Sequence, residues 1–187
     1  MSKPKLATQL IPAWVEGVLQ PVDKLKAHLD GLRHKAVSVF VLDGDKVLIQ
    51  RRALSKYHTP GLWANTCCTH PHWDEPDLDC AIRRLDDELG ITGLTLDRRG
   101  QVEYRAPVGG GMIEHEVVEI FVGQAAETMK ITPNPDEVMD FEWVTIDDLS
   151  AQTRAQSDRF TPWIKIYLEQ HAQRIFCDEA NRSPVTN

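Results

Sequence analysis

The chain has 187 residues, 42% of them hydrophobic and 26% charged, and its formal net charge is −7 at pH 7. These values are typical of a globular protein and exclude disordered and collagen-like classes. The length suits one domain over residues 1–187, with an N-terminal extension to about residue 20 and a frayed tail from about residue 178. The acidic balance argues against nucleic-acid binding, but an anionic small substrate can still meet a locally basic site.

The N-terminal sequence and the cysteines indicate the compartment. The four cysteines have no spacing that suggests a disulfide framework, and reduced thiols suit a cytoplasmic protein. No N-terminal apolar region resembles a signal peptide, and no run of about 20 apolar residues could span a membrane. We therefore expect a cytoplasmic monomer or weak homodimer without a membrane partner.

In chain order, the first predicted elements are a helix and two strands. The segment 22–30 predicts a short helix that ends at Gly31. Alternating apolar residues predict strands over 34–42 and 46–52, and Asp43-Gly44 between them is a tight-turn signal.

The next predicted helix lies between Pro76, which suits a first turn, and Gly90, which suits a C-terminal stop. Arg84 and Glu88 fall together on one flank of its apolar stripe, a position that suits residues reaching a cleft. The stripe is formed by Leu78, Ala81, Ile82, Leu85 and Leu89.

The second half of the chain predicts a hairpin, a further strand and two helices. The pattern of strands and helices favours an α+β fold over a doubly wound one. The predicted segments are strands over 101–107 and 112–123 joined by Gly109-Gly110-Gly111, a strand over 138–146, a short helix capped by Thr145, and a final helix from Thr161-Pro162 to about Cys177.

Two glutamates interrupt the strand "IEHEVVEIFV". Alternate residues of a strand share a face, so Glu114 and Glu116 point the same way as Val118, Ile120 and Val122. That face is expected to be the core side, where two ionised carboxylates require a cation or hydrogen bonds to compensate them. The alternative is that both glutamates face solvent and the other apolar face of the strand is buried.

Three histidines could serve the same cation. His28, His34 and His70 each offer an imidazole, and three imidazoles with two carboxylates would suit a transition-metal ion such as Zn²⁺ or Mn²⁺. The alternative for each histidine alone is an ordinary surface or hydrogen-bonded residue.

The stretch "WANTCCTHPHWDE" places two adjacent cysteines before a histidine. A zinc knuckle would need two spaced pairs of ligands, and no second pair of cysteines follows. Cys67 and Cys68 would point to opposite faces of a strand. One thiol is therefore predicted to be buried packing, and the other a functional acid or nucleophile.

Basic residues gather around this stretch. Arg51, Arg52 and Lys56 precede it, and Arg84 lies on the helix flank. In an acidic protein, clustered guanidinium groups suit a phosphate or diphosphate ligand. The alternative is a solvated, charged strand end.

Four motifs, "QRRALSKYHTPGLWANTCCTHP", "AIRRLDDELG", "YRAP" and "IEHEV", together resemble the type 1 isopentenyl-diphosphate isomerases, from about Leu25 to Trp163. That family belongs to the Nudix superfamily. The resemblance therefore implies an α+β fold with a mixed β-sheet core flanked by helices. The hydrolytic Nudix signature is eroded here, because Arg84 and Asp87 stand where hydrolases carry glutamates and only Glu88 of that trio remains.

The resemblance also implies a role for each matching residue. Cys68 matches the catalytic cysteine, Glu116 the catalytic glutamate and Tyr104 the tyrosine beside it, and Cys67 is read as packing. The implied substrate contacts are Arg52, Lys56 and Arg84 for the diphosphate and Trp163 for the hydrocarbon end. The implied ligands of a tightly bound Mn²⁺ or Zn²⁺ are His28, His34, His70, Glu114 and Glu116, and Glu88 matches the ligand of a Mg²⁺ that arrives with the diphosphate.

The activity implied by the resemblance is the interconversion of isopentenyl and dimethylallyl diphosphates in isoprenoid biosynthesis. Protonation of the double bond gives a tertiary carbocation, which then loses a proton. We favour Glu116 with Tyr104 as the proton donor and Cys68 as the opposite group. Two other functions stay open: a Nudix hydrolase acting on a nucleoside diphosphate derivative, and a non-catalytic metal-binding or interaction module.

Overall fold

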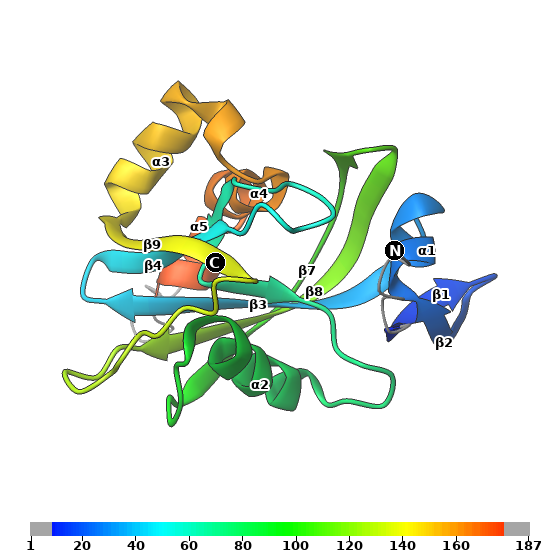
Figure 1. Ribbon diagram of the computed structural model, residues 1–187, viewed down its shortest axis with the longest axis horizontal. Coiled ribbons are helices and arrows are strands. Elements are labelled where there is room, and N and C mark those ends of the chain that lie inside the picture. The colour runs from blue at the N-terminus through cyan, green and yellow to red at the C-terminus, as the bar shows by residue number, and fades with distance from the viewer. Residues whose placement is uncertain (1–8, 178–187) are drawn as a thin grey trace, which may run out of the picture.

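The structure is a computed structural model that describes residues 9–177. Within these residues nine strands form one mixed sheet (Figure 1). The strands are β1 (Leu10–Val15), β2 (Val18–Asp23), β3 (His34–Asp43), β4 (Lys46–Arg52), β5 (Trp63–Asn65), β6 (Cys67–Thr69), β7 (Leu96–Gly109), β8 (Met112–Gln124) and β9 (Val138–Thr145). The helices are α1 (Lys24–Leu29), α2 (Asp77–Leu89), α3 (Ile146–Ala155), the 3₁₀ turn η1 (Ser157–Arg159), α4 (Pro162–Gln170) and α5 (Ala172–Phe176).

Strand β3 is the centre of the sheet. It pairs in parallel with β8 and antiparallel with β4, β6 and β1. Its side chains alternate between two buried faces, so that Phe40 joins one hydrophobic cluster and Val39 and Val41 join another. A strand covered on both faces reads as a continuous apolar run, which is how "AVSVFVL" appears in the sequence.

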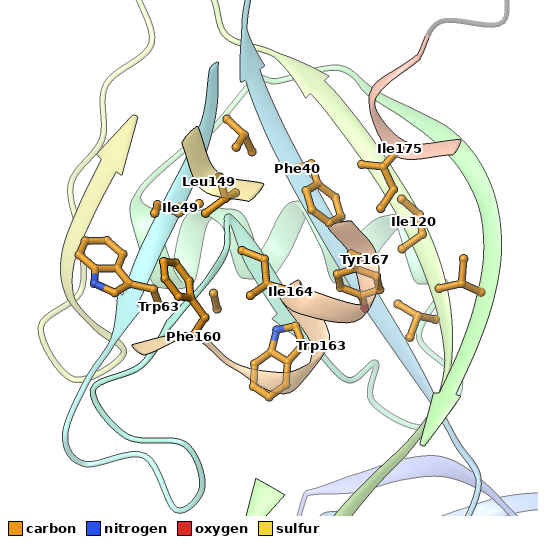
Figure 2. Packing of buried hydrophobic residues seen from close by; sticks show 14 of the residues in the cluster. Phe40, Ile49, Trp63, Ile120, Leu149, Phe160, Trp163, Ile164, Tyr167 and Ile175 are labelled. Carbon is orange, nitrogen blue, oxygen red and sulfur yellow. The ribbon is translucent and has the colours of Figure 1, made fainter. Parts of the chain in front are cut away.

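Helices cover the two faces of the sheet in unequal numbers. Helix α2 lies on one face, and α3, α4 and α5 lie on the other (Figure 1). Figure 2 shows the larger cluster, in which Phe40 and Ile120 from the sheet contact Tyr167 and Ile175 from α4 and α5. The α+β class with a mixed sheet flanked by helices is therefore confirmed.

The helix predicted from Pro76 to Gly90 is α2. Pro76 immediately precedes it in an extended conformation, and Gly90 ends it with the left-handed φ of 62°. Its apolar stripe is narrower than predicted, because Leu78 is 42% exposed and Ile82 is 46% exposed. The buried face of α2 is formed instead by Cys80, Ala81, Leu85, Glu88 and Leu89.

The final helix is not continuous as predicted. It divides at His171, whose φ of −131° is not helical, into α4 and α5. This break redirects the chain, and Ile175 and Phe176 pack with Phe40 over the sheet. Apolar spacing predicted the burial of this segment but could not predict the change of direction.

The N-terminal hairpin was not predicted. Strands β1 and β2 pair antiparallel around a turn in which Glu16 and Gly17 both have positive φ. Strand β2 continues to Asp23, so the predicted helix over 22–30 is shortened to α1, with Asp23 Oδ1 accepting a hydrogen bond from the Lys26 amide at 2.9 Å. The predicted tail from residue 178 lies outside the described residues.

Hairpin β7–β8 carries the two glutamates and Tyr104 of the predicted site. The two strands pair along most of their lengths, with Tyr104 opposite Glu116 and Ala106 opposite Glu114. The start of β8 lies against α1. Ile113 of β8 is so close to Gly31 that a Cβ at this glycine would lie 3.2 Å from the Ile113 side chain. In the part of the chain that the structure describes, no helix combines the length and apolar character needed to cross a membrane.

The packing of α2 against the sheet generates a stability prediction. Leu85 is 2% exposed within the cluster that contains Val37, so Leu85→Ala removes apolar contacts and leaves a cavity. We expect the free energy of unfolding to fall by about 2–5 kcal/mol, measured by urea denaturation. Ile82→Ala on the exposed side of the same helix is the matched control, and its change should stay within about 0.5 kcal/mol. Equal losses in both variants would contradict this packing.

Candidate functional site

The predicted site residues gather at one pocket. His28, His34 and Tyr104 lie just behind its wall, where they contact Glu114 or Glu116. All other predicted residues line it, together with some that were not predicted. The lining residues are Lys24, Arg52, Lys56, Tyr57, His58, Cys68, Thr69, His70, Arg84, Glu88, Glu114, Glu116 and Trp163.

Strand pairing brings the metal-type ligands together. Glu114 and Glu116 are alternate residues of β8, and His34 begins β3 directly beside Glu116 in the parallel register. His70 follows β6, which pairs with the other edge of β3, and His28 comes from α1. Because four separate segments supply these residues, only the tertiary structure can bring them to one place.

These groups are close to one another and buried. Glu114 Oε2 lies 3.0 Å from His28 Nε2 and 3.4 Å from His34 Nε2. Glu116 Oε1 lies 2.8 Å from His70 Nε2. The ligand atoms of four residues lie within 4.8 Å of one another, those of His28, His34, His70 and Glu114.

The hydrogen bonds of the imidazoles test whether a cation fits. His28 Nδ1 lies 2.6 Å from the Lys24 carbonyl oxygen, and His34 Nδ1 lies 2.7 Å from that of Leu32. A carbonyl only accepts, so each Nδ1 carries a proton, and each Nε2 presents a lone pair to the cluster when the ring is neutral. Lone pairs therefore converge with carboxylate oxygens, and His28 Nε2 has no hydrogen-bond partner. A divalent ion would supply the missing positive charge, and the nitrogen and oxygen donors suit a transition metal.

The pKa values of the cluster residues also show that positive charge is favourable there. Burial opposes the charged form of Glu114, but the four imidazoles around it hold its pKa well below the usual value. Burial and the neighbouring Glu114 also oppose ionisation of Glu116, yet its pKa is lowered by hydrogen bonds from His34 and His70. Against burial, the two carboxylates raise the pKa of His34 to about 9. A divalent cation could neutralise these carboxylates in place of a proton.

Glu116 and Cys68 are the groups that could exchange protons with a ligand in the pocket. Glu116 Oε2 accepts a short hydrogen bond from the Tyr104 hydroxyl. Cys68 Sγ accepts one from Ser38 Oγ at 3.2 Å, and Ser38 Oγ lies 2.8 Å from the Tyr167 hydroxyl. Burial raises the pKa of the Cys68 thiol well above its usual value, and the charge of Glu116 raises it further, so this thiol is protonated at neutral pH.

The adjacent cysteines have different environments. Cys67 is fully buried in the cluster under α2, whereas Cys68 lies on the opposite face of β6 and lines the pocket. The prediction that the two thiols face opposite ways is therefore confirmed.

The basic residues form the other side of the pocket. Arg52 is 8% exposed, and its guanidinium lies 5.3 Å from the centre of the Trp163 ring. Arg84 Nη2 donates to Glu88 Oε1 at 2.5 Å and to Glu137 Oε2 at 3.2 Å. Lys56 also pairs with Glu137. Acidic partners thus hold two of these cations in place beside the pocket.

The sequence analysis missed four polar residues of the pocket, Lys24, Tyr57, His58 and Thr69, and two of them carry basic nitrogens. Lys24 is one helical turn before His28, and this i to i+4 spacing is a signal that could have found it. Burial, together with the charges of Lys56 and Arg84, lowers the pKa of Lys24 to about 8. His58 lies in the loop between β4 and β5, where no periodicity marks it. Burial lowers the pKa of His58 to about 4, although Glu114 opposes this shift.

Comparison with known proteins identifies the family of this chain. The NUDIX domain family matches residues 32–164. The curated isopentenyl-diphosphate Delta-isomerases of Rhodobacter capsulatus and Roseobacter denitrificans are each 64% identical to this chain. The first match covers 91% of this chain and 97% of the relative, and the second covers 90% and 96%.

Solved structures share the fold at much lower identity. DR0079 from Deinococcus radiodurans is 14% identical, with a TM-score of 0.69 over 86% of this chain and 96% of that one. A MutT NUDIX hydrolase from Burkholderia pseudomallei is 21% identical, with a TM-score of 0.57 over 74% and 98%. These similarities concern the fold alone, whereas the sequence relatives extend over nearly the whole chain. The chain therefore belongs to the Nudix family and, within it, to the isopentenyl-diphosphate Delta-isomerases.

Proposed function

We propose that this chain interconverts isopentenyl diphosphate and dimethylallyl diphosphate. One observation supports this above the others: the Cys68 thiol and the Glu116 carboxyl with its Tyr104 hydroxyl meet at one pocket that basic side chains also line. A double-bond shift needs one group that gives a proton, another that takes one, and a place for the diphosphate.

The proposed reaction is one protonation followed by one deprotonation. Because the Cys68 thiol is protonated and the Glu116 carboxyl is ionised, the thiol gives a proton to the terminal carbon of the double bond, the reverse of the order favoured from the sequence. The electron pair of that bond forms the new C–H bond. The resulting tertiary carbocation loses a proton from the neighbouring methylene to the Glu116 carboxylate, which Tyr104 hydrogen-bonds, and the electron pair of the broken C–H bond forms the new double bond. The substrate gains and loses one proton, so its composition is unchanged. Water must be excluded, because it would trap the cation.

Aromatic and acidic side chains support the charged intermediate. Trp163 is 2% exposed and lines the pocket, so its ring can face the carbocation. A desolvated contact of this kind is worth about 2 kcal/mol or more. The buried carboxylates of Glu114 and Glu116 also favour positive charge nearby.

The proposal includes two kinds of metal ion. A tightly held Mn²⁺ or Zn²⁺ would be bound by the three histidines and two glutamates of the cluster, where it would fix the Glu116 carboxyl and tune its acidity. A Mg²⁺ that arrives with the diphosphate would be bound in part by Glu88. Glu88 is 4% exposed, and its two oxygens accept hydrogen bonds from Arg84 and from Gln50 at 2.7 Å.

The diphosphate would lie against four cations, Lys24, Arg52, Lys56 and Arg84. Hydrolysis of a nucleoside diphosphate derivative is less well supported. Arg84 and Asp87 replace two of the glutamates that hydrolases use to gather magnesium, and Arg84 pairs with the remaining Glu88.

The first experiment follows isopentenyl diphosphate incubated with the protein and Mg²⁺. We expect an acid-labile product, because the allylic diphosphate hydrolyses readily in acid, and no release of phosphate before acid treatment. Phosphate release from nucleoside diphosphate derivatives would instead support a hydrolase. Metal binding without turnover of any isoprenoid diphosphate would support a non-catalytic module.

The second prediction separates the adjacent cysteines. Cys68→Ala removes a proposed proton donor, so kcat should fall by about 10²–10⁴-fold. Cys67→Ala changes only packing under α2 and should retain most of the activity. Steady-state kinetics measure both, with circular dichroism as the check of folding. Similar losses of kcat in two folded variants would contradict the assignment of Cys68.

The third prediction concerns pH. The Lys24 pKa of about 8 means that its charge is complete well below pH 8 and is lost as the pH rises through 8. Because the charged form attracts the diphosphate, KM should rise above pH 8 by up to about tenfold per unit. Lys24→Arg keeps the charge and should remove this rise. Lys26→Arg, on the exposed side of α1, is the control and should keep the wild-type profile. An unchanged profile in Lys24→Arg would exclude Lys24 as its source.

A further inference from the structure

His58 is the one imidazole in the pocket that the metal-type cluster does not include. It is 6% exposed, and its Nε2 lies 3.1 Å from Glu114 Oε1. The other oxygen, Glu114 Oε2, is the one that faces His28 and His34. The two sides of a single carboxylate therefore meet different partners.

Hydrogen bonding gives His58 a different tautomer from the cluster histidines. An ionised carboxylate oxygen only accepts, so His58 Nε2 must carry a proton to bond with Glu114 Oε1. His58 Nδ1 lies 3.1 Å from Thr59 Oγ1, a hydroxyl that can donate to its lone pair. In His28 the proton is instead on Nδ1, and Nε2 presents a lone pair. His58 is thus a hydrogen-bond donor to the carboxylate and not a further metal ligand.

Other contacts connect His58 to the substrate side of the pocket. Its backbone oxygen accepts a hydrogen bond from Arg52 Nη2 at 3.2 Å. Its ring meets the Trp163 ring edge-on, with centroids 6.0 Å apart, and stacks on His28 at 5.6 Å. The next residue, Thr59, has a φ of 46°, an uncommon conformation that the loop retains here.

We propose that His58 is a positioning residue that fixes the Glu114 carboxylate with Oε2 toward the metal site and connects that site to Arg52. The role of His58 at the metal site follows from the hydrogen bond between His58 and Glu114, whereas the role of its contact with Arg52 rests on the proposed function. Outer hydrogen bonds of this kind fix the orientation of a ligand, and their loss typically lowers metal affinity or activity 10–100-fold.

The experiment measures the rate at which Zn²⁺ leaves the Zn²⁺-loaded protein in excess chelator, without substrate. His58→Phe keeps an aromatic ring against Trp163 but has no N–H donor, and we expect release about 10–100-fold faster than in the wild type. His58→Gln retains an N–H donor and should release Zn²⁺ at a rate between these two. His72→Phe makes the same substitution at an exposed histidine outside the pocket and should not differ from the wild type. Wild-type release in His58→Phe would overturn the proposal.

A second measurement on the unmodified protein covers the case in which the Phe variant fails to fold. Nitrogen-15 NMR of the Zn²⁺-loaded wild type reports the tautomer of each histidine. We expect His58 to be protonated at Nε2 and His28 at Nδ1. A His58 that is protonated only at Nδ1 could not donate to Glu114, and this result would overturn the proposal.

The link to substrate is measured with inorganic diphosphate titrated into the Zn²⁺-loaded variants with Mg²⁺ present. Weaker binding in His58→Phe than in His72→Phe is expected if the loop holds Arg52, and equal binding would overturn that link. These results can be distinguished from those of the isomerase assay. If the wild type does not isomerise but its Zn²⁺ release depends on His58, the proposed function is refuted and the positioning role of His58 is retained. If the wild type is active and His58→Phe releases Zn²⁺ at the wild-type rate, the positioning role is refuted and the proposed function is retained.

Discussion

The structure depends on two carboxylates that are buried together on one strand. Glu114 and Glu116 are 2% and 1% exposed, and two such charges can stay ionised inside a protein only when positive charge and donors surround them. Around this pair the chain places imidazoles from α1, β3 and the end of β6, together with the hydroxyl of Tyr104. The same requirement for positive charge explains why the site suits a divalent ion and why it could stabilise a carbocation.

Strands β3 and β8 each carry apolar core residues along one part of their length and ionisable site residues along another. Over 36–42, the side chains on both faces of β3 are buried and apolar, except for Ser38, whose hydroxyl is hydrogen-bonded. At the start of β3 and along the first half of β8, the buried residues change from apolar to ionisable. The long β7–β8 hairpin carries these positions past the helices to the pocket wall. Packing at one end of the sheet thus holds the polar groups rigidly at the other.

Strand geometry also assigns different roles to adjacent residues. Cys67 contributes to the cluster under α2, while Cys68, one residue later, lines the pocket and contacts Ser38. A strand reverses the side-chain direction at each residue, so a one-residue shift of β6 would exchange the two thiols. The pairing of Ser38 with Cys68 in the β3–β6 register therefore positions the thiol.

The sequence by itself determined the local elements and the residue types of the site. Pro76 and Gly90 defined α2, the alternation in β8 placed both glutamates on one buried face, and the motifs indicated the family. Only the tertiary structure decided which distant residues meet, because strand pairing and loop paths depend on contacts far apart in the sequence. That is why the β1–β2 hairpin, the break at His171, and the position of His58 beside the carboxylates could not be derived from periodicity. It is also why Leu78 and Ile82, which share the spacing of the buried stripe, are partly exposed: the orientation of α2 on the sheet, and not the helical period, decides which side of the stripe is covered.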